Sequence, residues 1–223
     1  MLILGVDTSW KNGNIALVRD GDVVAAAPLE GGTFSAQLVP QIARLLSRNK
    51  LGKRDLGGLS VVSGPGSFTG LRVGLAAVKA LAEILKVPIT ATTVLEAMVL
   101  DLASEGKSAA ALEAGRGELY VAEYEVRRNG DAFQAAPLRQ LVLSGADAAI
   151  ALRSSKVVCC EPATADLLRG AGLEVQEAPR PDSAAIARIG GRKIAAGNTI
   201  TPEQLDAEYI RRSDAELFSA PKP

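Results

Sequence analysis

The chain has 223 residues, which fits one domain or two small ones, and its 48% hydrophobic and 22% charged residues exclude a disordered chain. Lys and Arg number 25, as do Asp and Glu, so the basic excess of a dominant nucleic-acid binder is missing. The sequence contains no histidine, which excludes histidine triads, histidine general bases and histidine-ligated metal sites.

The sequence carries no signal for secretion or for a membrane. The N-terminus lacks a basic region followed by an apolar core, and the longest apolar run, Val23–Leu29, is far below the ~20 residues that a membrane span needs. Cys159 and Cys160 are adjacent, which suits free thiols in a buried strand better than a disulfide. We therefore expect a soluble cytoplasmic protein that does not bind a membrane.

The pattern of the first half predicts an antiparallel meander followed by alternating helices and strands. The predicted strands cover 2–6, 15–18, 23–27, 59–62 and 87–91, and the predicted helices cover 35–48, 71–86 and 93–103. The second half predicts strands over 109–112, 119–126, 139–142 and 156–160, and helices over 146–152, 164–171 and 183–196. Because both halves open with strands and end with helices, the sequence predicts a mixed α/β protein with two similar layers.

Two segments of the first half could carry chemistry. Asp7, Thr8 and Ser9 follow the first strand, where a carboxylate and two hydroxyls can hold a hydrated cation or touch a phosphate. A turn stabilised by the Asp7 side chain is the alternative. The second segment runs from Gly64 to Arg72 and leads into a helix.

The second segment is rich in glycine and hydroxyl residues. Gly64, Gly66 and Gly70 let the backbone approach another group closely, and Ser67 and Thr69 can cap the helix. The amides of a helix N-terminus attract anions, so a phosphate site is one interpretation and a tight structural joint is the other. It is not a P-loop, since no lysine follows the last glycine at the required spacing.

A third segment, Glu113–Tyr120, places carboxylates and Arg116 around a glycine turn, and an ion pair explains it equally well. No nucleophile and base stand together in the sequence, so we predict no catalytic residue and no metal site.

The segment Gly64-Pro65-Gly66-Ser67-Phe68-Thr69-Gly70-Leu71-Arg72-Val73-Gly74 resembles the TsaB (YeaZ) family of bacterial tRNA threonylcarbamoyladenosine biosynthesis proteins. Weaker similarities lie at 4–9, 117–120 and 208–211. The resemblance implies an actin-like, Hsp70-like ATPase (ASKHA) fold of two subdomains, each with a mixed sheet and helices. We expect one subdomain over 1–104, to which a segment of about 205–223 returns, and a second, degenerate subdomain over 105–204.

The resemblance also implies a function. Proteins of this family are similar to the TsaD subunit but lack its metal-binding histidines and its catalysis. They bind TsaD and, with the ATPase TsaE, support threonylcarbamoyl transfer to adenosine 37 of tRNA. The chain would thus be a scaffold that meets tRNA only through the complex, forms a homodimer when alone, and needs no cofactor of its own, since ATP is used by the complex.

The sequence departs from the family pattern at Phe34, where a histidine is usual, and at Glu113 and Gly115 in a motif that usually reads Asp-Ala-Arg-Arg-Gly-Glu. Two other functions stay open. An independent nucleotide-dependent phosphotransferase of this fold needs a glycine-rich adenosine motif, which the second half lacks. A metallopeptidase needs metal ligands, for which the chain offers only scattered carboxylates.

The predicted helix over 71–86 is apolar around most of its circumference. It is either enclosed within its own domain or exposed on one side to a partner. By resemblance, this helix and the helix over 35–48 form the surface that meets TsaD or a second copy. The residues expected at that interface are Leu38, Leu45, Leu71, Gly74, Ala77, Val78, Ala80 and Leu81.

Overall fold

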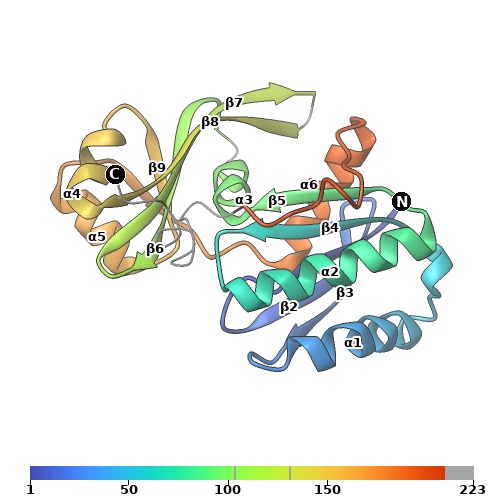
Figure 1. The fold of residues 1–223 in the computed structure, drawn as a ribbon. Helices are drawn as coiled ribbons and strands as arrows, with labels where there is room; N and C mark the ends of the chain where they lie inside the picture. Colours follow the sequence, from blue (N-terminus) through green and yellow to red (C-terminus); the bar gives the residue numbers. More distant parts are fainter. Residues whose placement is uncertain (103, 131, 209–223) are drawn as a thin grey trace, which may run out of the picture. The chain divides into compact units, whose positions relative to one another are not determined.

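A computed structural model describes residues 1–102, 104–130 and 132–208 and divides the chain into two compact units. Unit 1 consists of Met1–Ala97 and Pro181–Ala207. Unit 2 consists of Met98–Arg180 and, among the described C-terminal residues, Glu208. Each unit is built on one five-stranded sheet (Figure 1).

The sheet of unit 1 has the strand order β3-β2-β1-β4-β5. Its strands are β1 (Leu2–Asp7), β2 (Gly13–Arg19), β3 (Asp22–Leu29), β4 (Leu56–Gly64) and β5 (Ile89–Thr93). The first three strands pair antiparallel, which confirms the predicted meander, while β4 pairs parallel to both β1 and β5. All six residues of β1 are buried, as an apolar strand covered on both faces requires.

Helices cover both faces of this sheet. Figure 1 shows α1 (Phe34–Arg48) beside α2 (Phe68–Leu85), and α2 packs on β4. On the other face α6 (Ser183–Ala195) packs on β1 and β4. Successive side chains of a strand point to opposite faces, so β1 can contact helices on both sides of the sheet. Ile3 packs against α6, and the neighbouring Leu4 points to the opposite face.

The sheet of unit 2 has the order β10-β9-β6-β7-β8. Its strands are β6 (Gly106–Gly115), β7 (Glu118–Asn129), β8 (Ala132–Ser144), β9 (Lys156–Cys159) and β10 (Val175–Glu177). Helices α4 (Gly145–Ala151) and α5 (Pro162–Gly170) bury Ala149 and Leu168 against it. The short helix α3 (Val94–Asp101) leads from unit 1 into unit 2, and a 3-10 turn, η1 (Lys53–Asp55), precedes β4.

The expected second subdomain over 105–204 is wrong for its last part, because Pro181–Ala207 belongs to unit 1. Long-range bonds hold α6 there: the Ser60 hydroxyl donates to the Ile186 carbonyl at 2.9 Å, and Lys193 Nζ lies 2.8 Å from a Glu96 carboxylate oxygen. Of the segment about 205–223 that was expected to return to the first subdomain, residues 205–207 lie in unit 1 and residues 209–223 lie outside the described residues. Of residues 208–211, which carry one of the weaker similarities to the TsaB (YeaZ) family, only residue 208 lies within the described residues.

The cysteines are free thiols, as expected from their spacing. Burial, and next the nearby charge of Glu161, raises the pKa of Cys159 to about 12, which keeps this thiol protonated at neutral pH. Within the described ranges we find no helix with both the length and the hydrophobicity to cross a bilayer.

A buried carboxylate, Glu123 of β7, ties three elements of unit 2 together. Its side chain is 2% exposed and accepts hydrogen bonds from Ser155 Oγ, at 2.5 Å, and from Arg139 Nε. Lys107 Nζ lies 3.7 Å away. Burial by itself would raise the pKa of Glu123, but the hydrogen bonds from Ser155 and Arg139 and the charges of Arg139 and Lys107 outweigh it and lower the pKa below 4.5.

We predict that Glu123→Gln lowers the free energy of unfolding by about 1–3 kcal/mol at neutral pH, because a charge-assisted network is lost without a change in size. A lowered folded-state pKa stabilises the fold above the ordinary value of 4.5, and this contribution is lost as the pH falls through the folded-state pKa. The difference in the free energy of unfolding between the parent and Glu123→Gln should therefore shrink as the pH falls below 4.5 and through the folded-state pKa of Glu123.

Denaturant unfolding between neutral pH and about pH 3 measures this difference. The exposed Glu174 of unit 2 provides the control Glu174→Gln, which should unfold like the parent at every pH. A constant difference between Glu123→Gln and the parent across this range would contradict the assigned role of the Glu123 charge.

Candidate functional site

The two candidate segments of unit 1 meet at one edge of its sheet. Because β1 and β4 are parallel neighbours, their carboxyl ends lie side by side, so the residues after Asp7 face those after Gly64. The Ser67 amide donates to the Ser9 carbonyl at 2.8 Å and joins the two segments directly. The structure thus brings together residues that the sequence could only propose separately.

The first segment is a side-chain-stabilised turn. Asp7 Oδ1 accepts hydrogen bonds from the Ser9 amide, at 2.8 Å, and from the Ser9 hydroxyl, at 2.5 Å. Asp7, Thr8 and Ser9 are all buried. This geometry favours the turn interpretation over a cation site, because the carboxylate already serves the local backbone.

The glycines of the second segment are required by close packing. A Cβ on Gly66 would lie 2.1 Å from the Ser9 carbonyl oxygen, and a Cβ on Gly70 would lie 2.1 Å from the Thr8 carbonyl oxygen. Thr8 Oγ1 donates to the Gly70 carbonyl at 2.8 Å. The space that these glycines leave is therefore occupied by the backbone of the chain itself.

The remaining residues of the segment shape the start of α2. Gly64 has φ +146°, a conformation that favours glycine, and the Gly64–Pro65 peptide is cis. Ser67 caps α2 by accepting from the Gly70 amide at 3.2 Å, as predicted. Thr69, the other predicted cap, lies within the helix, which begins at Phe68, three residues earlier than expected.

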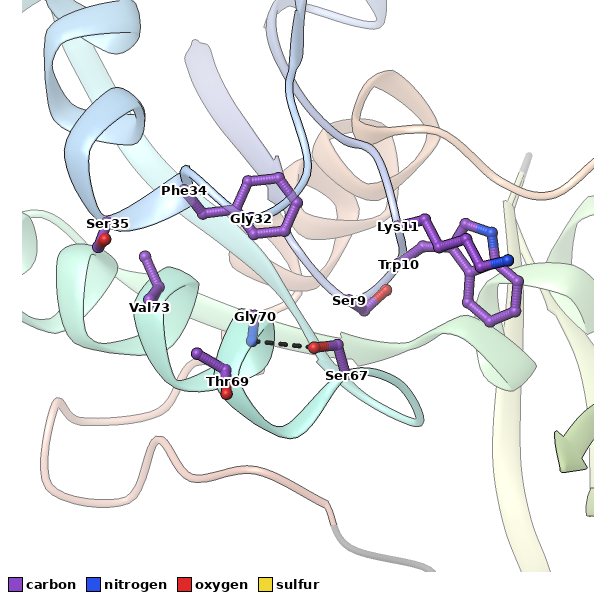
Figure 2. A pocket seen from close by; sticks show the side chains of 10 residues that line it. All are labelled: Ser9, Trp10, Lys11, Gly32, Phe34, Ser35, Ser67, Thr69, Gly70 and Val73. Carbon is purple, nitrogen blue, oxygen red and sulfur yellow. Dashed lines mark hydrogen bonds between the residues drawn. The ribbon is translucent and has the colours of Figure 1, made fainter.

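A cleft of about 380 Å³ opens beside this joint (Figure 2). Ser67 and Thr69 line it together with Trp10, Lys11 and Phe34. Sequence reasoning did not propose Trp10 and Lys11, although the only tryptophan of the chain directly follows the Asp7–Ser9 turn and was available as a signal. An aromatic wall and one lysine beside a helix N-terminus suit an anionic or aromatic group.

The third segment belongs to unit 2, where Gly115, Arg116 and Gly117 form the turn between β6 and β7 with positive φ angles. Within the described residues, no group of three or more Cys, Asp or Glu side chains is placed to hold a metal ion.

Several residues expected at a partner interface lie inside unit 1, which corrects the prediction for Leu38, Leu45, Leu71, Gly74 and Val78. They are buried because α2 packs on β4 and beside α1, so they cannot contact a partner directly.

Among the other expected residues, Ala77 and Leu81 are half-buried, and Ala80 is exposed. With Ala76 and Ile84, Ala80 forms an exposed ridge on α2, and Ile84 is 69% exposed. We call Ala76, Ala80 and Ile84 the α2 ridge. The helix therefore has a buried face and an exposed face, on which the α2 ridge lies beside the charged Arg72 and Glu83.

Two units that each carry a mixed five-stranded sheet and helices define an actin-like (ASKHA) fold. YeaZ from Pseudomonas aeruginosa has this fold with a TM-score of 0.75 and 20% identity, over 93% of this chain and 99% of that one. A sequence model of the family "TsaD: tRNA N6-adenosine threonylcarbamoyltransferase" matches residues 31–150. The chain belongs to this family.

Within the family the chain is similar to the TsaB (YeaZ) proteins. The tRNA threonylcarbamoyladenosine biosynthesis protein TsaB of Bacillus subtilis is 32% identical over 65% of this chain and 63% of its own length. The Escherichia coli protein of the same name is 31% identical over 58% of each chain. The match thus spans somewhat less than two thirds of these relatives.

We predict that Gly70→Ala destabilises the protein by about 1–3 kcal/mol, because the new Cβ overlaps the Thr8 carbonyl oxygen. The matched control is Gly170→Ala at the end of α5, where a Cβ meets no atom within 4 Å and should cost nothing. Thermal unfolding compares both with the parent, and equal melting temperatures for all three proteins would contradict the required close approach.

A double-mutant cycle tests the contact between α2 and the turn. A Cβ on Gly74 would lie 2.3 Å from Thr8 Oγ1, whereas the Thr8 Cβ is 3.5 Å away. We predict that Gly74→Ala is strongly destabilising alone but costs about 1 kcal/mol less in a Thr8→Ala background, because the overlapping hydroxyl is gone. Additive free energies of unfolding would show that the two residues are not coupled.

Proposed function

We propose that this chain is a non-catalytic scaffold subunit that binds a TsaD-type subunit in cytoplasmic tRNA threonylcarbamoyladenosine modification. The family match and the TsaB relatives support the pathway. The absence of histidine from the sequence supports an accessory role, because a TsaD-type metal site depends on histidine ligands. TsaE and tRNA would join through the complex.

The single observation that carries the accessory role is the packing of the glycine-rich loop. In a loop that cradles phosphate, glycine leaves room for the ligand to approach the backbone. Here the positions next to Gly66 and Gly70 are filled by the Ser9 and Thr8 carbonyls. The loop thus serves to dock α2 onto β1, and the exposed face of α2 is left for a partner.

The α2 ridge is the proposed contact surface for TsaD and, in its absence, for a second copy. Its small side chains, Ala76 and Ala80, would let a partner helix approach closely, and Ile84 offers apolar area. At the start of the same helix Arg72 Cζ lies 3.5 Å from the centre of the Phe68 ring, and Phe68 is 45% exposed. An exposed aromatic with an arginine is typical of an interface anchor.

Affinity capture with the full chain as bait, from a lysate of the native organism, tests this function, and we expect a TsaD-type protein as the main partner. ATP turnover then separates scaffold from enzyme. The chain alone should hydrolyse no ATP above background, and turnover should appear only when TsaD and TsaE are added. Robust turnover by the chain alone would favour the phosphotransferase and contradict the proposal.

We predict that Ala80→Arg weakens TsaD binding and self-association at least about tenfold, because a charge is placed in an apolar contact. The exposed Ala196, just after α6, gives the control Ala196→Arg, which should bind like the parent. Size-exclusion chromatography with light scattering and titration with TsaD measure both effects. If Ala80→Arg folds and binds TsaD normally, the α2 ridge is not the interface.

A further inference from the structure

Although the chain as a whole carries no net charge, one exposed segment of unit 1 is strongly basic. Residues 44–55, from the last turns of α1 through η1, contain five cations and one carboxylate, so the rest of the chain has a net negative charge. All five cationic residues are exposed, and we call them the basic segment: Arg44, Arg48, Lys50, Lys53 and Arg54. The basic segment lies at the opposite end of α1 from the cleft beside the glycine-rich loop (Figure 1).

The backbone of the basic segment is fixed by hydrogen bonds. The Leu51 amide donates to the Leu46 carbonyl at 3.0 Å, just after α1 ends. The Gly52 amide then donates to Asp55 Oδ2 at 2.6 Å, and the Asp55 amide donates to the Gly52 carbonyl at 3.0 Å, which closes η1. The cations therefore project from an ordered surface, and the one carboxylate among them serves the local backbone.

Neighbouring groups do not neutralise this charge. Within the part of the chain that the structure describes, no cation of the basic segment forms an ion pair. At the same edge of the sheet, Asp20 pairs with the terminal ammonium of Met1. Glu83, near the end of α2, pairs with Lys86. Asp22 at the start of β3 adds one exposed carboxylate to this edge, so the balance stays positive.

The stability of α1 does not account for the five cations. A cation in the last turn of a helix interacts favourably with the helix dipole, but the effect is confined to that turn. Arg44 lies before the last turn, and Lys53 and Arg54 belong to η1. Lys50 has φ +58°, a conformation that favours glycine after a helix. The fold alone would favour glycine there, and the chain carries a cation instead.

We propose that the basic segment binds the phosphate backbone of tRNA. Guanidinium and ammonium groups donate charge-assisted hydrogen bonds to phosphate oxygens, and several such contacts supply affinity without reading the sequence. An anionic membrane is a poorer match, because the apolar face of α1, with Leu38, Ile42 and Leu45, is buried and cannot insert. The choice of RNA rests on the proposed function, in which tRNA joins through the complex, and the basic segment would be one place where that complex holds it.

Fluorescence anisotropy with a labelled, unmodified tRNA transcript tests the proposal, using the full chain alone and the full chain with TsaD at several salt concentrations. The chain alone should bind weakly, with a Kd of about 10⁻⁴–10⁻⁶ M, and the logarithm of the binding constant should fall linearly with the logarithm of the salt concentration. A transcript of unrelated sequence should bind equally well. Absence of tRNA binding in both samples, or binding that does not depend on salt, would overturn the proposal.

A triple variant, Lys50→Gln with Lys53→Gln and Arg54→Gln, locates the contact. We expect it to bind tRNA at least about tenfold more weakly than the parent, both alone and with TsaD. The slope of binding against salt should fall by about two to three, because each lost phosphate contact lowers it by about one. The matched control removes three exposed cations elsewhere, in Arg19→Gln with Arg127→Gln and Arg153→Gln, and should bind like the parent. Equal weakening in the two triple variants would show that net charge acts and not the basic segment.

The single variant Lys50→Gly separates charge from folding. Glycine suits the φ angle at this position, so the melting temperature should not fall below that of the parent, while tRNA binding weakens about twofold to threefold. Parent-like tRNA binding in Lys50→Gly and in the folded triple variant of the basic segment would overturn the proposal.

Titration with TsaD separates this proposal from the proposed function. The triple variant of the basic segment should bind TsaD like the parent, because the α2 ridge is unchanged. If it loses TsaD binding and keeps tRNA binding, the basic segment meets a protein, and if it loses only binding to vesicles of phosphatidylcholine and phosphatidylserine, it meets a membrane; either result overturns the proposal. A parent chain that does not bind TsaD would contradict the proposed function, whereas the tRNA titrations of the chain alone would still decide on the basic segment.

Discussion

The fold of unit 1 depends on one close contact, where the carboxyl end of β1 touches the start of α2. The carbonyl oxygens of Thr8 and Ser9 occupy the space that Gly70 and Gly66 leave, and the Ser67 amide binds the Ser9 carbonyl. A side chain at either glycine would push the helix away from the sheet. The segment that most resembles a ligand-binding loop is thus a packing joint, and its glycines serve the backbone of the same chain.

The same principle operates on the other face of the sheet. A Cβ on Gly5 would lie 2.0 Å from the Ser183 carbonyl oxygen, and Gly190 sits against Ser60, so α6 approaches β1 and β4 through glycine on both sides. With helices docked closely on both faces, β1 is fully buried. Among the surfaces of unit 1 that stay exposed are the α2 ridge and the cleft beside the joint.

These features separate the family's shared fold from the role of this chain. An actin-like fold by itself hosts many functions, so the role must be argued from its sites. The joint is filled, the buried carboxylate Asp7 serves a turn, and the buried thiol of Cys159 stays protonated at neutral pH. What remains exposed on α2 is the small-residue ridge beside Arg72 and Glu83, and the proposed scaffold role rests on this surface.

The sequence by itself determined the local structure: the meander, the strand before Gly64, the cap at Ser67 and the free thiols, because periodicity, turn residues and caps act over a few neighbours. It also carried the family resemblance. Only the tertiary structure decided that α6 belongs to unit 1, through a bond from Ser60 to Ile186 that spans 126 residues. The charged residues Arg72, Glu83 and Lys86 mark the exposed side of α2 already in the sequence. Only the tertiary structure decided that Leu71, Gly74 and Val78 are enclosed within unit 1, because contacts with the distant segments β4 and α1 determine which apolar residues of the helix are covered.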